Sequence, residues 1–272
     1  MIQLNFSGFT SFVHTYRLHV IMVYILASIL FVGVFEELTY FVILPMVCFT
    51  SLCAGSYLIN RYFDVDADTI NEVAYKIKNK VILLWLSIFF ITLPFFLLIV
   101  GSFAVSPFFI FTPISFLYSY KLMEFRFKDF WLTKNMFAAL MWYVSWVIVV
   151  VCYGKEGYEV YEIFKITWPW IPLLLTYELL WDLRDVKGDM QTGTSTIPTV
   201  FGFKFSKYLA LVMFFVFLCA TLYITQDIIF SAGYLPVAVG IVLLKSSTKA
   251  FNYHLFIYYQ IVMLSIALIL WS

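Results

Sequence analysis

The residues best suited to chemistry form two acid-rich clusters in a chain of which only 12% is charged. The first cluster occupies residues 60–68 and the second occupies residues 182–189. Because each residue of an α-helix turns by about 100°, side chains three or four residues apart share one face. The spacing therefore predicts two stripes of oxygen-bearing side chains. These are Asn60, Asp64 and Asp68 in the first cluster, and Asp182, Asp185 and Asp189 in the second.

Both stripes are suited to binding metal. Carboxylate and amide oxygens, with no cysteine or histidine beside them, favour hard divalent cations and Mg²⁺ above all. In proteins Mg²⁺ usually takes one or two carboxylates together with phosphates of a substrate. The stripes thus predict Mg²⁺ as the cofactor and a substrate that carries a diphosphate. Scattered acids at solvated helix ends are the alternative, but that alternative does not explain two aligned stripes.

The elements that must position these clusters are membrane helices. The chain is 63% hydrophobic with a mean hydropathy of +0.94. Apolar stretches near the ~20 residues that cross a bilayer predict helices, because backbone groups in lipid must bond within their own segment. The expected spans are residues 18–35, 39–59, 81–103, 105–120, 136–153, 165–181, 207–224, 228–244 and 253–271. We therefore predict an all-α membrane protein of nine transmembrane helices, forming a single domain over residues 1–272.

The basic residues predict how this bundle lies in the membrane. With nine spans, 15 of the 17 Lys and Arg residues fall on the side of the N-terminus, and only Lys155 and Lys165 fall on the other. The positive-inside rule then places the N-terminus and both acid clusters in the cytoplasm, at the inner membrane if the source is bacterial. No basic patch typical of nucleic-acid binding is present, and no obligate protein partner is expected.

Other polar residues give weaker indications. Glu178 lies one turn before the second cluster, inside an expected span, where a carboxylate is costly and often functional. It is a candidate for a position beside an acceptor substrate. The three histidines, His14, His19 and His254, show no spacing typical of metal ligands, so we expect interfacial or packing roles for them.

Together these segments resemble the UbiA superfamily of intramembrane prenyltransferases. The Asn-x-x-x-Asp-x-x-x-Asp pattern of residues 60–68 resembles the first signature of that family. The Asp-x-x-Asp-x-x-x-Asp pattern of residues 182–189, followed by residues 196–202, resembles the second signature and its tail. Residues 118–121 and Asn135 resemble the loop after the fourth span. The match extends from about residue 60 to residue 202 and places all three loops on one membrane face.

The resemblance implies a polyprenyl diphosphate held by Mg²⁺ in a central cavity that opens to lipid, and a small-molecule acceptor for the prenyl group. The implied metal ligands are Asn60, Asp64 and Asp68 for one ion, and Asp185 and Asp189, assisted by Asp182, for another. The implied catalytic residues are Asp64, Asp68, Asp185 and Asp189. The expected diphosphate contacts are Asn60, Lys121, Arg126, Arg61 and Lys187. These side chains are polar or positively charged and can donate hydrogen bonds to phosphate oxygens.

The identity of the acceptor stays open, because residues 71–80 depart from the sequence pattern of the family. Many members carry an Arg-Pro segment before the third span, whereas residues 71–80 carry lysines and no Arg-Pro. Our leading hypothesis is transfer to an aromatic acceptor in quinone, pigment or lipid biosynthesis. One alternative is a terpene cyclase, in which the prenyl cation is trapped internally. Another is a membrane transporter or ion-binding protein, although transport sites usually lie near the bilayer midplane rather than at helix ends.

Overall fold

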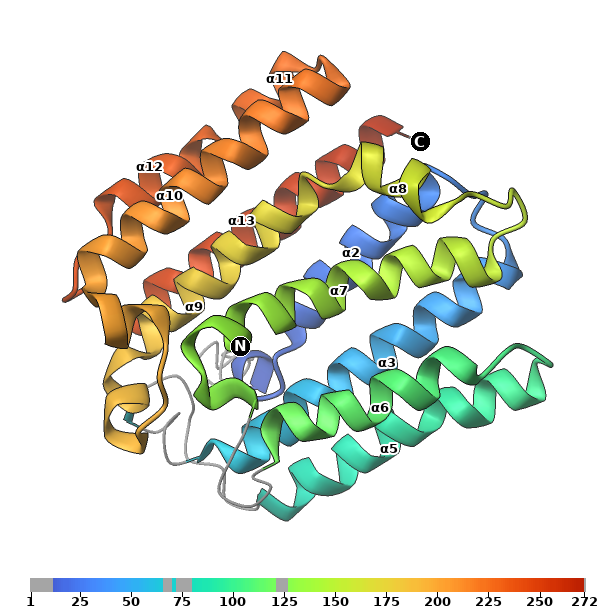
Figure 1. The fold of residues 1–272 in the computed structure, drawn as a ribbon, viewed down its shortest axis with the longest axis horizontal. Helices are drawn as coiled ribbons and strands as arrows, with labels where there is room; N and C mark the ends of the chain where they lie inside the picture. Colours follow the sequence, from blue (N-terminus) through green and yellow to red (C-terminus); the bar gives the residue numbers. More distant parts are fainter. Residues whose placement is uncertain (1–11, 66–69, 72–79, 121–126, 272) are drawn as a thin grey trace, which may run out of the picture.

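A computed structural model describes residues 12–65, 70–71, 80–120 and 127–271. All regular structure in these residues is helical, which confirms the predicted all-α class. Figure 1 shows the arrangement of the helices. They are α2 (Leu18–Gly33), α3 (Tyr40–Phe63), α5 (Lys80–Val100), α6 (Ser106–Ser119), the 3₁₀ helix η1 (Phe127–Asp129), α7 (Trp131–Tyr153), α8 (Val160–Thr167), α9 (Trp170–Thr192), α10 (Ile197–Thr225), α11 (Ile228–Gly233), α12 (Leu235–Leu243) and α13 (Ala250–Trp271).

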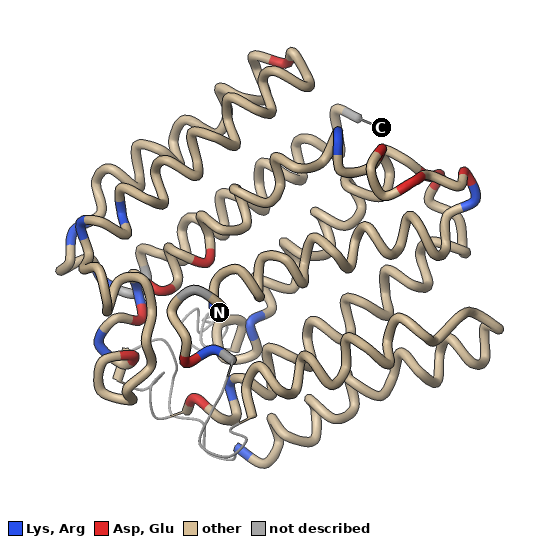
Figure 2. The backbone as a smooth tube through the Cα atoms, in the orientation of Figure 1, with Lys and Arg blue, Asp and Glu red and all other residues tan. Residues whose placement is uncertain are grey.

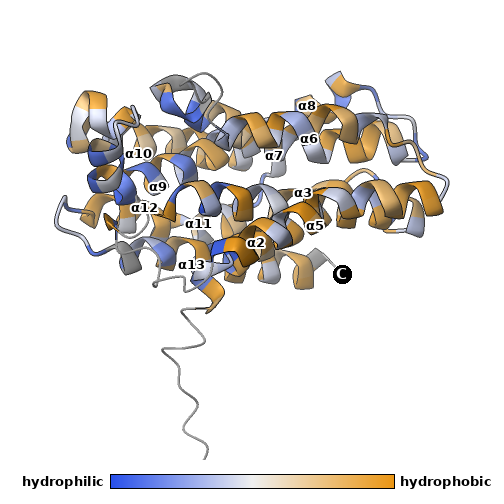
Figure 3. Ribbon diagram, turned by 90° about the horizontal axis from the view of Figure 1, so that it is seen from below, coloured by the Kyte–Doolittle hydropathy of each residue, from blue (hydrophilic) through white to orange (hydrophobic). Residues whose placement is uncertain are grey.

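The long helices run in alternating directions along one bundle (Figure 1). Helices α3, α6 and α9 terminate at the same end, which we call the acidic end and define by Phe63, Ser119 and Thr192. Charged residues lie mainly at the two ends of the helices, and the stretches between them are nearly free of charge (Figure 2). Hydrophobic residues cover most of the helix lengths (Figure 3). A bundle surrounded by lipid requires this distribution.

Within the described residues, five helices are long and apolar enough to cross a membrane. Those segments are Tyr40–Phe63, Lys80–Val100, Thr133–Tyr153, Ile197–Thr225 and Asn252–Leu270. Helix α2 is shorter, α9 carries the second acid cluster, and the span predicted at 228–244 is divided into α11 and α12 at Tyr234. The number of nine spans and the cytoplasmic N-terminus therefore stay predictions.

The second acid cluster lies inside a helix. A loop between the spans predicted at residues 165–181 and 207–224 is therefore wrong except at residues 193–196, because α9 includes residues 182–192 and α10 begins at Ile197. Helix α9 continues to Thr192 and ends at Gly193, whose φ of 73° favours glycine. Helix α10 then begins after Thr196, which caps it by accepting a hydrogen bond from the Thr199 amide. The family-like tail of this cluster, residues 196–202, thus forms the N-terminal cap and the first residues of α10.

Among the described helices, five close a ring. Helix α2 packs on α3, α3 on α7, α7 on α9, α9 on α13, and α13 back on α2 (Figure 1). Helices α5 and α6 pack on α3, and α10 packs on α9. Buried aromatic side chains such as Tyr24, Phe31 and Trp146 fill much of the ring. The two helices that bear the acid clusters, α3 and α9, are separated by α7 on one side and by α2 and α13 on the other.

The close approach of α3 to α5 depends on Gly55. The Ser87 hydroxyl donates to the Gly55 carbonyl at 2.8 Å, and a Cβ on Gly55 would lie 2.6 Å from Cγ1 of Ile91.

We expect Gly55→Val to lower the free energy of unfolding by about 1–3 kcal/mol, because an overpacked contact must be relieved by moving a helix. Thermal unfolding in detergent measures the effect. Val47→Leu, on an exposed position of α3, is the control, and equal melting temperatures for the two variants would contradict the prediction.

Candidate active site

A cavity of about 270 Å³ lies inside the ring and reaches the acidic end. Its walls differ in character along their length. The polar wall includes Asn60, Asp64, Asp182, Asp185 and Asp189, which come from both acid clusters. The apolar wall includes Phe49, Leu52, Phe111, Phe137, Met141 and Trp142. The cavity therefore offers one environment to a charged group and another to a hydrocarbon within a single space.

The first acid cluster meets a lysine from a distant segment. Asn60 lies in the last turn of α3, and Asp64 follows the end of that helix. Lys128 of η1 donates from Nζ to Oδ1 of Asn60 at 3.0 Å and forms an ion pair with Asp64. The Ser119 hydroxyl also donates to Oδ1 of Asn60, at 3.2 Å. Asp68, the third member of the predicted stripe, lies outside the described residues.

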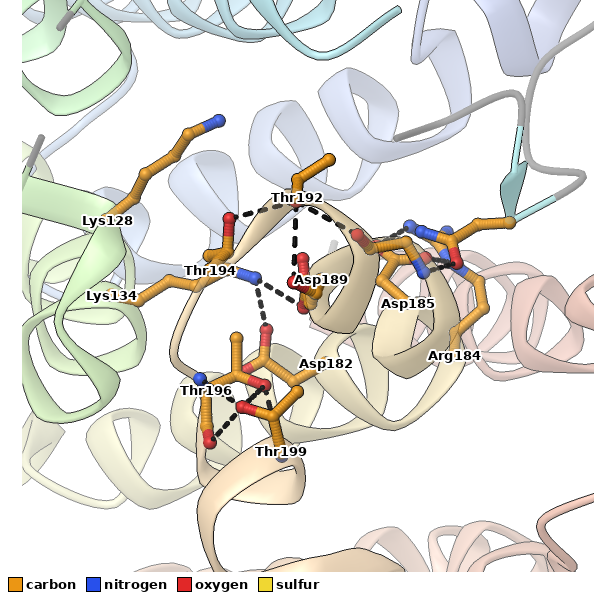
Figure 4. Close-up of polar contacts among 12 residues, drawn as sticks. Lys128, Lys134, Asp182, Arg184, Asp185, Asp189, Thr192, Thr194, Thr196 and Thr199 are labelled. Atoms are coloured by element: carbon orange, nitrogen blue, oxygen red, sulfur yellow. Dashed lines mark hydrogen bonds and ion pairs between the residues drawn. The ribbon is translucent and has the colours of Figure 1, made fainter. Parts of the chain in front are cut away.

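The second acid cluster meets another lysine. Nζ of Lys134, in the first turn of α7, lies 2.8 Å from Oδ1 of Asp182 and 3.2 Å from Oδ2 of Asp189 (Figure 4). Asp182 is only 1% exposed and Asp189 is 7% exposed. The two carboxylates are seven residues apart on α9 and so reach the same ammonium group. Burial of this kind requires a counter-charge, which Lys134 supplies.

Asp185 has a different partner. Arg184 donates from Nε to Oδ1 of Asp185 at 2.7 Å and from Nη2 to Oδ2 at 2.6 Å, which forms a bidentate pair (Figure 4). The guanidinium carbon of Arg184 also lies 4.2 Å from the centroid of the Trp181 ring. This arrangement fixes the orientation of the Asp185 carboxylate at the rim of the cavity.

Burial sets the charge of these groups. Burial raises the pKa of the Asp189 carboxyl to about 7, although the nearby Lys134 favours its ionised form. Burial also opposes ionisation of Asp185, but Arg184 outweighs it and lowers the pKa of that carboxyl. A further cation would therefore stabilise the ionised form of Asp189. A set of donors made only of carboxylate and amide oxygens fits Mg²⁺, so the residues present suit the metal that the sequence predicts.

A hydrogen bond joins the second cluster to the segment that follows the first. The backbone amide of Gly188, between two aspartates of α9, donates to Oδ1 of Asn71 at 2.6 Å. Asn71 belongs to the segment that follows the first cluster, and it is 7% exposed. The contact holds residues 117 positions apart in the chain. It therefore ties the segment after α3 to the helix that carries the second stripe.

Unlike the described acids of the two clusters, none of the predicted cationic contacts is found at the cavity wall among the described residues. Lys121 and Arg126 lie outside the described residues. Arg61 is 1% exposed, and Lys187 lies on the exposed face of α9. Neither of these two is among the described residues that line the cavity.

The residues that sequence reasoning missed are Lys128, Lys134 and Asn71. The two lysines belong to the basic and aromatic segment 121–135, in which the sequence favours Lys121 and Arg126 instead. Lys134 directly precedes Asn135, one of the family-like positions, and that adjacency was the available signal. No spacing rule links Asn71 to Gly188, because their contact depends on how the chain folds back.

Glu178 lies deeper in the same cavity, one helical turn before Asp182. It also lines a smaller cavity of about 30 Å³, together with Tyr57 and Trp142. These two side chains line the larger cavity as well. Glu178 therefore lines both cavities, and six aromatic side chains line the smaller one with it.

Comparisons with known proteins bear on the fold and on the family. The fold matches the solved structure of a UbiA homologue from Archaeoglobus fulgidus bound to DMAPP and Mg²⁺. The match has a TM-score of 0.60 at 16% identity and covers 94% of this chain and 99% of that chain. At this identity the match establishes the fold alone.

Three sequence relatives are digeranylgeranylglyceryl phosphate synthases. The protein of Methanobrevibacter smithii is 29% identical over 209 residues, which are 72% of this chain and 71% of that protein. The protein of Pyrococcus horikoshii is 26% identical over 208 residues, 72% of this chain and 69% of that protein. A third relative, the synthase of that name from Thermococcus gammatolerans, is 27% identical over 165 residues, 58% of this chain and 56% of that protein. The model of the UbiA prenyltransferase family matches residues 20–256, so this chain belongs to that family and is a membrane prenyltransferase.

Proposed function

We propose that this prenyltransferase moves a prenyl group from a polyprenyl diphosphate to a small-molecule acceptor, with Mg²⁺ held between the two acid clusters. The observation that carries the proposal is the cavity whose charged end receives carboxylates from both α3 and α9 and whose other walls are apolar. A prenyl diphosphate has the same division between charge and hydrocarbon. The Mg²⁺ ligands would be Asn60, Asp64, Asp182, Asp185 and Asp189, with Asp68 as a further predicted ligand.

The side chains of the charged end suit departure of the diphosphate. Bound Mg²⁺ would neutralise the charge that develops on the diphosphate as the C–O bond breaks. Lys128 and Lys134 line the same space, and their ammonium groups are charge-assisted donors for phosphate oxygens. On substrate binding each lysine would exchange a carboxylate partner for phosphate. Lys121 and Arg126 stay predicted contacts of the same kind, and so do Arg61 and Lys187.

The apolar walls suit the other product of ionisation, an allylic cation. They exclude water, which would otherwise capture the cation. Aromatic faces such as that of Trp142 attract a cation by roughly 0.5–2 kcal/mol each. The acceptor must then enter the same space and lose a proton. Glu178, which lines both cavities, is positioned to take that proton.

The acceptor that we propose is aromatic, because six aromatic side chains line the smaller cavity that Glu178 shares, and such rings offer stacking surfaces to a planar ring. A second candidate is the hydroxyl group of a glyceryl phosphate lipid, which the names of the three relatives favour. We also propose that the acidic end faces the cytoplasm, since 15 of the 17 basic residues share its predicted side.

Removal of a single carboxylate from either cluster should abolish turnover. We expect Asp64→Ala and Asp185→Ala each to lower kcat at least about 100-fold, because each removes a group that holds the charge-neutralising cation. The assay is release of diphosphate from a labelled prenyl diphosphate in membranes with Mg²⁺, and chelation by EDTA should give the same loss. Glu37→Gln, at an exposed acid of the opposite end, is the control. Near-normal turnover by either alanine variant would remove that residue from the metal site.

The lysines should contribute to rate without holding metal. We expect Lys134→Met and Lys128→Met to lower kcat about 10- to 1,000-fold, because each removes a donor for the leaving group. The dependence of rate on Mg²⁺ concentration should stay close to that of the original protein. Lys165→Met, at an exposed lysine on the opposite end, should have no effect. Loss of Mg²⁺ affinity with an unchanged maximal rate would assign the lysines a purely structural role.

The identity of the acceptor can be decided by product analysis. Labelled geranylgeranyl diphosphate and Mg²⁺ are incubated with the membranes and a hydroxybenzoate or naphthoate, with a glyceryl phosphate ether lipid, or with no acceptor. We expect a prenylated aromatic product. A prenylated lipid would establish the second candidate instead. A cyclic hydrocarbon or alcohol formed without any acceptor would identify a terpene cyclase.

A further inference from the structure

The only three histidines of this chain meet at one point. His14 precedes α2, His19 lies in its first turn, and His254 lies near the start of α13. One ring nitrogen of each lies within 4.8 Å of the others, and the residues are 7%, 3% and 2% exposed. The three histidines show no ligand spacing in the sequence, because the third is more than 230 positions from the first two. The packing role expected for isolated histidines does not explain their convergence.

The ring nitrogens already approach the arrangement that a metal needs. Nε2 of His19 lies 3.0 Å from Nδ1 of His254, so one of these two nitrogens carries the shared proton. Zinc binds imidazole nitrogen at about 2.0–2.1 Å, which places two tetrahedral ligand nitrogens about 3.3 Å apart. The ring of His14 stacks on that of His254 with centroids 4.0 Å apart. A modest rotation of the His14 ring would bring its nitrogen to the same point.

The hydroxyl group of Tyr258 is a hydrogen-bond partner for the histidine cluster. Nε2 of His14 and the hydroxyl of Tyr258 are 2.8 Å apart. Metal-bound histidines usually use their second ring nitrogen in such a contact, which fixes the ring. Two nearby cations are Arg17 and Arg184, and Arg184 is paired with Asp185. The cluster is therefore built from neutral nitrogen donors with support from a hydroxyl group.

The donor set distinguishes this cluster from the acidic one. Imidazole nitrogen suits Zn²⁺ and related transition metals, whereas Mg²⁺ prefers oxygen. We propose that His14, His19 and His254 form a second metal site, which binds one Zn²⁺ ion in a structural role. The ion would join the residues before α2 to α13, the first and last described helices of the ring. It would also support Trp181, whose ring lies 5.5 Å from that of His254 and lines the catalytic cavity.

The test is metal binding by the full-length protein, purified in detergent with an affinity tag that contains no histidine. We expect close to one zinc ion per chain by elemental analysis after dialysis, and a rise in melting temperature on addition of zinc. Substitution by Co²⁺ should give the visible absorption of a nitrogen-ligated site. His19→Gln and His254→Gln should weaken zinc binding at least about 100-fold, since changes to outer partners alone cost 10–100-fold.

Two further variants keep the result interpretable. Tyr258→Phe removes only the outer hydroxyl and should weaken zinc binding about tenfold in a normally folded protein. Asp64→Ala should bind zinc normally, even though it loses Mg²⁺-dependent turnover. Zinc content at background in the original protein would overturn the proposal and leave a hydrogen-bonded histidine cluster. Zinc retained by both glutamine variants, or lost in Asp64→Ala, would overturn it as well.

Discussion

The constraint on which this structure depends is the burial of carboxylates in an apolar bundle. A buried carboxylate without a partner costs several kcal/mol, and Asp182 is almost fully enclosed. The chain meets this cost with two lysines from one short segment. Lys128 pairs with the cluster at the end of α3, and Lys134 pairs with the cluster on α9. Residues 127–134 are therefore the piece of chain through which both clusters are electrostatically joined.

That segment also explains the place of α7 in the ring. Helix α7 begins at Trp131, three residues after Lys128, and packs on both α3 and α9. Its other end is held as well, because the buried carboxylate of Glu36 accepts hydrogen bonds from the amides of Lys155 and Glu156 at 3.0 and 3.1 Å. A helix fixed at both ends keeps Lys134, in its first turn, in place beside the acids of α9. The geometry of the catalytic end thus depends on contacts at the opposite end of the bundle.

The parts of this arrangement that sequence could predict are those set by local periodicity. The spacing of residues 182–189 predicts one helical face, and two of its aspartates do reach one lysine. The apolar stretches predict helices, but Pro236 and its neighbours divide one expected span, and α9 extends past its expected end. The partners Lys134 and Asn71 and the meeting of the histidines depend on how distant segments dock. Tertiary contacts of that kind leave no period in the sequence.

The ion pairs at the acidic end bear on how the proposed site would receive a diphosphate. Among the described residues, they bring four carboxylates to three cationic side chains, so these cations are already partnered. A diphosphate would have to compete with the carboxylates for the same ammonium and guanidinium groups. A divalent cation held by the carboxylates would release those groups to the phosphate oxygens. Without metal, uptake of a proton by Asp189, whose pKa burial raises to about 7, would weaken the hold of that carboxyl on Lys134 in the same way.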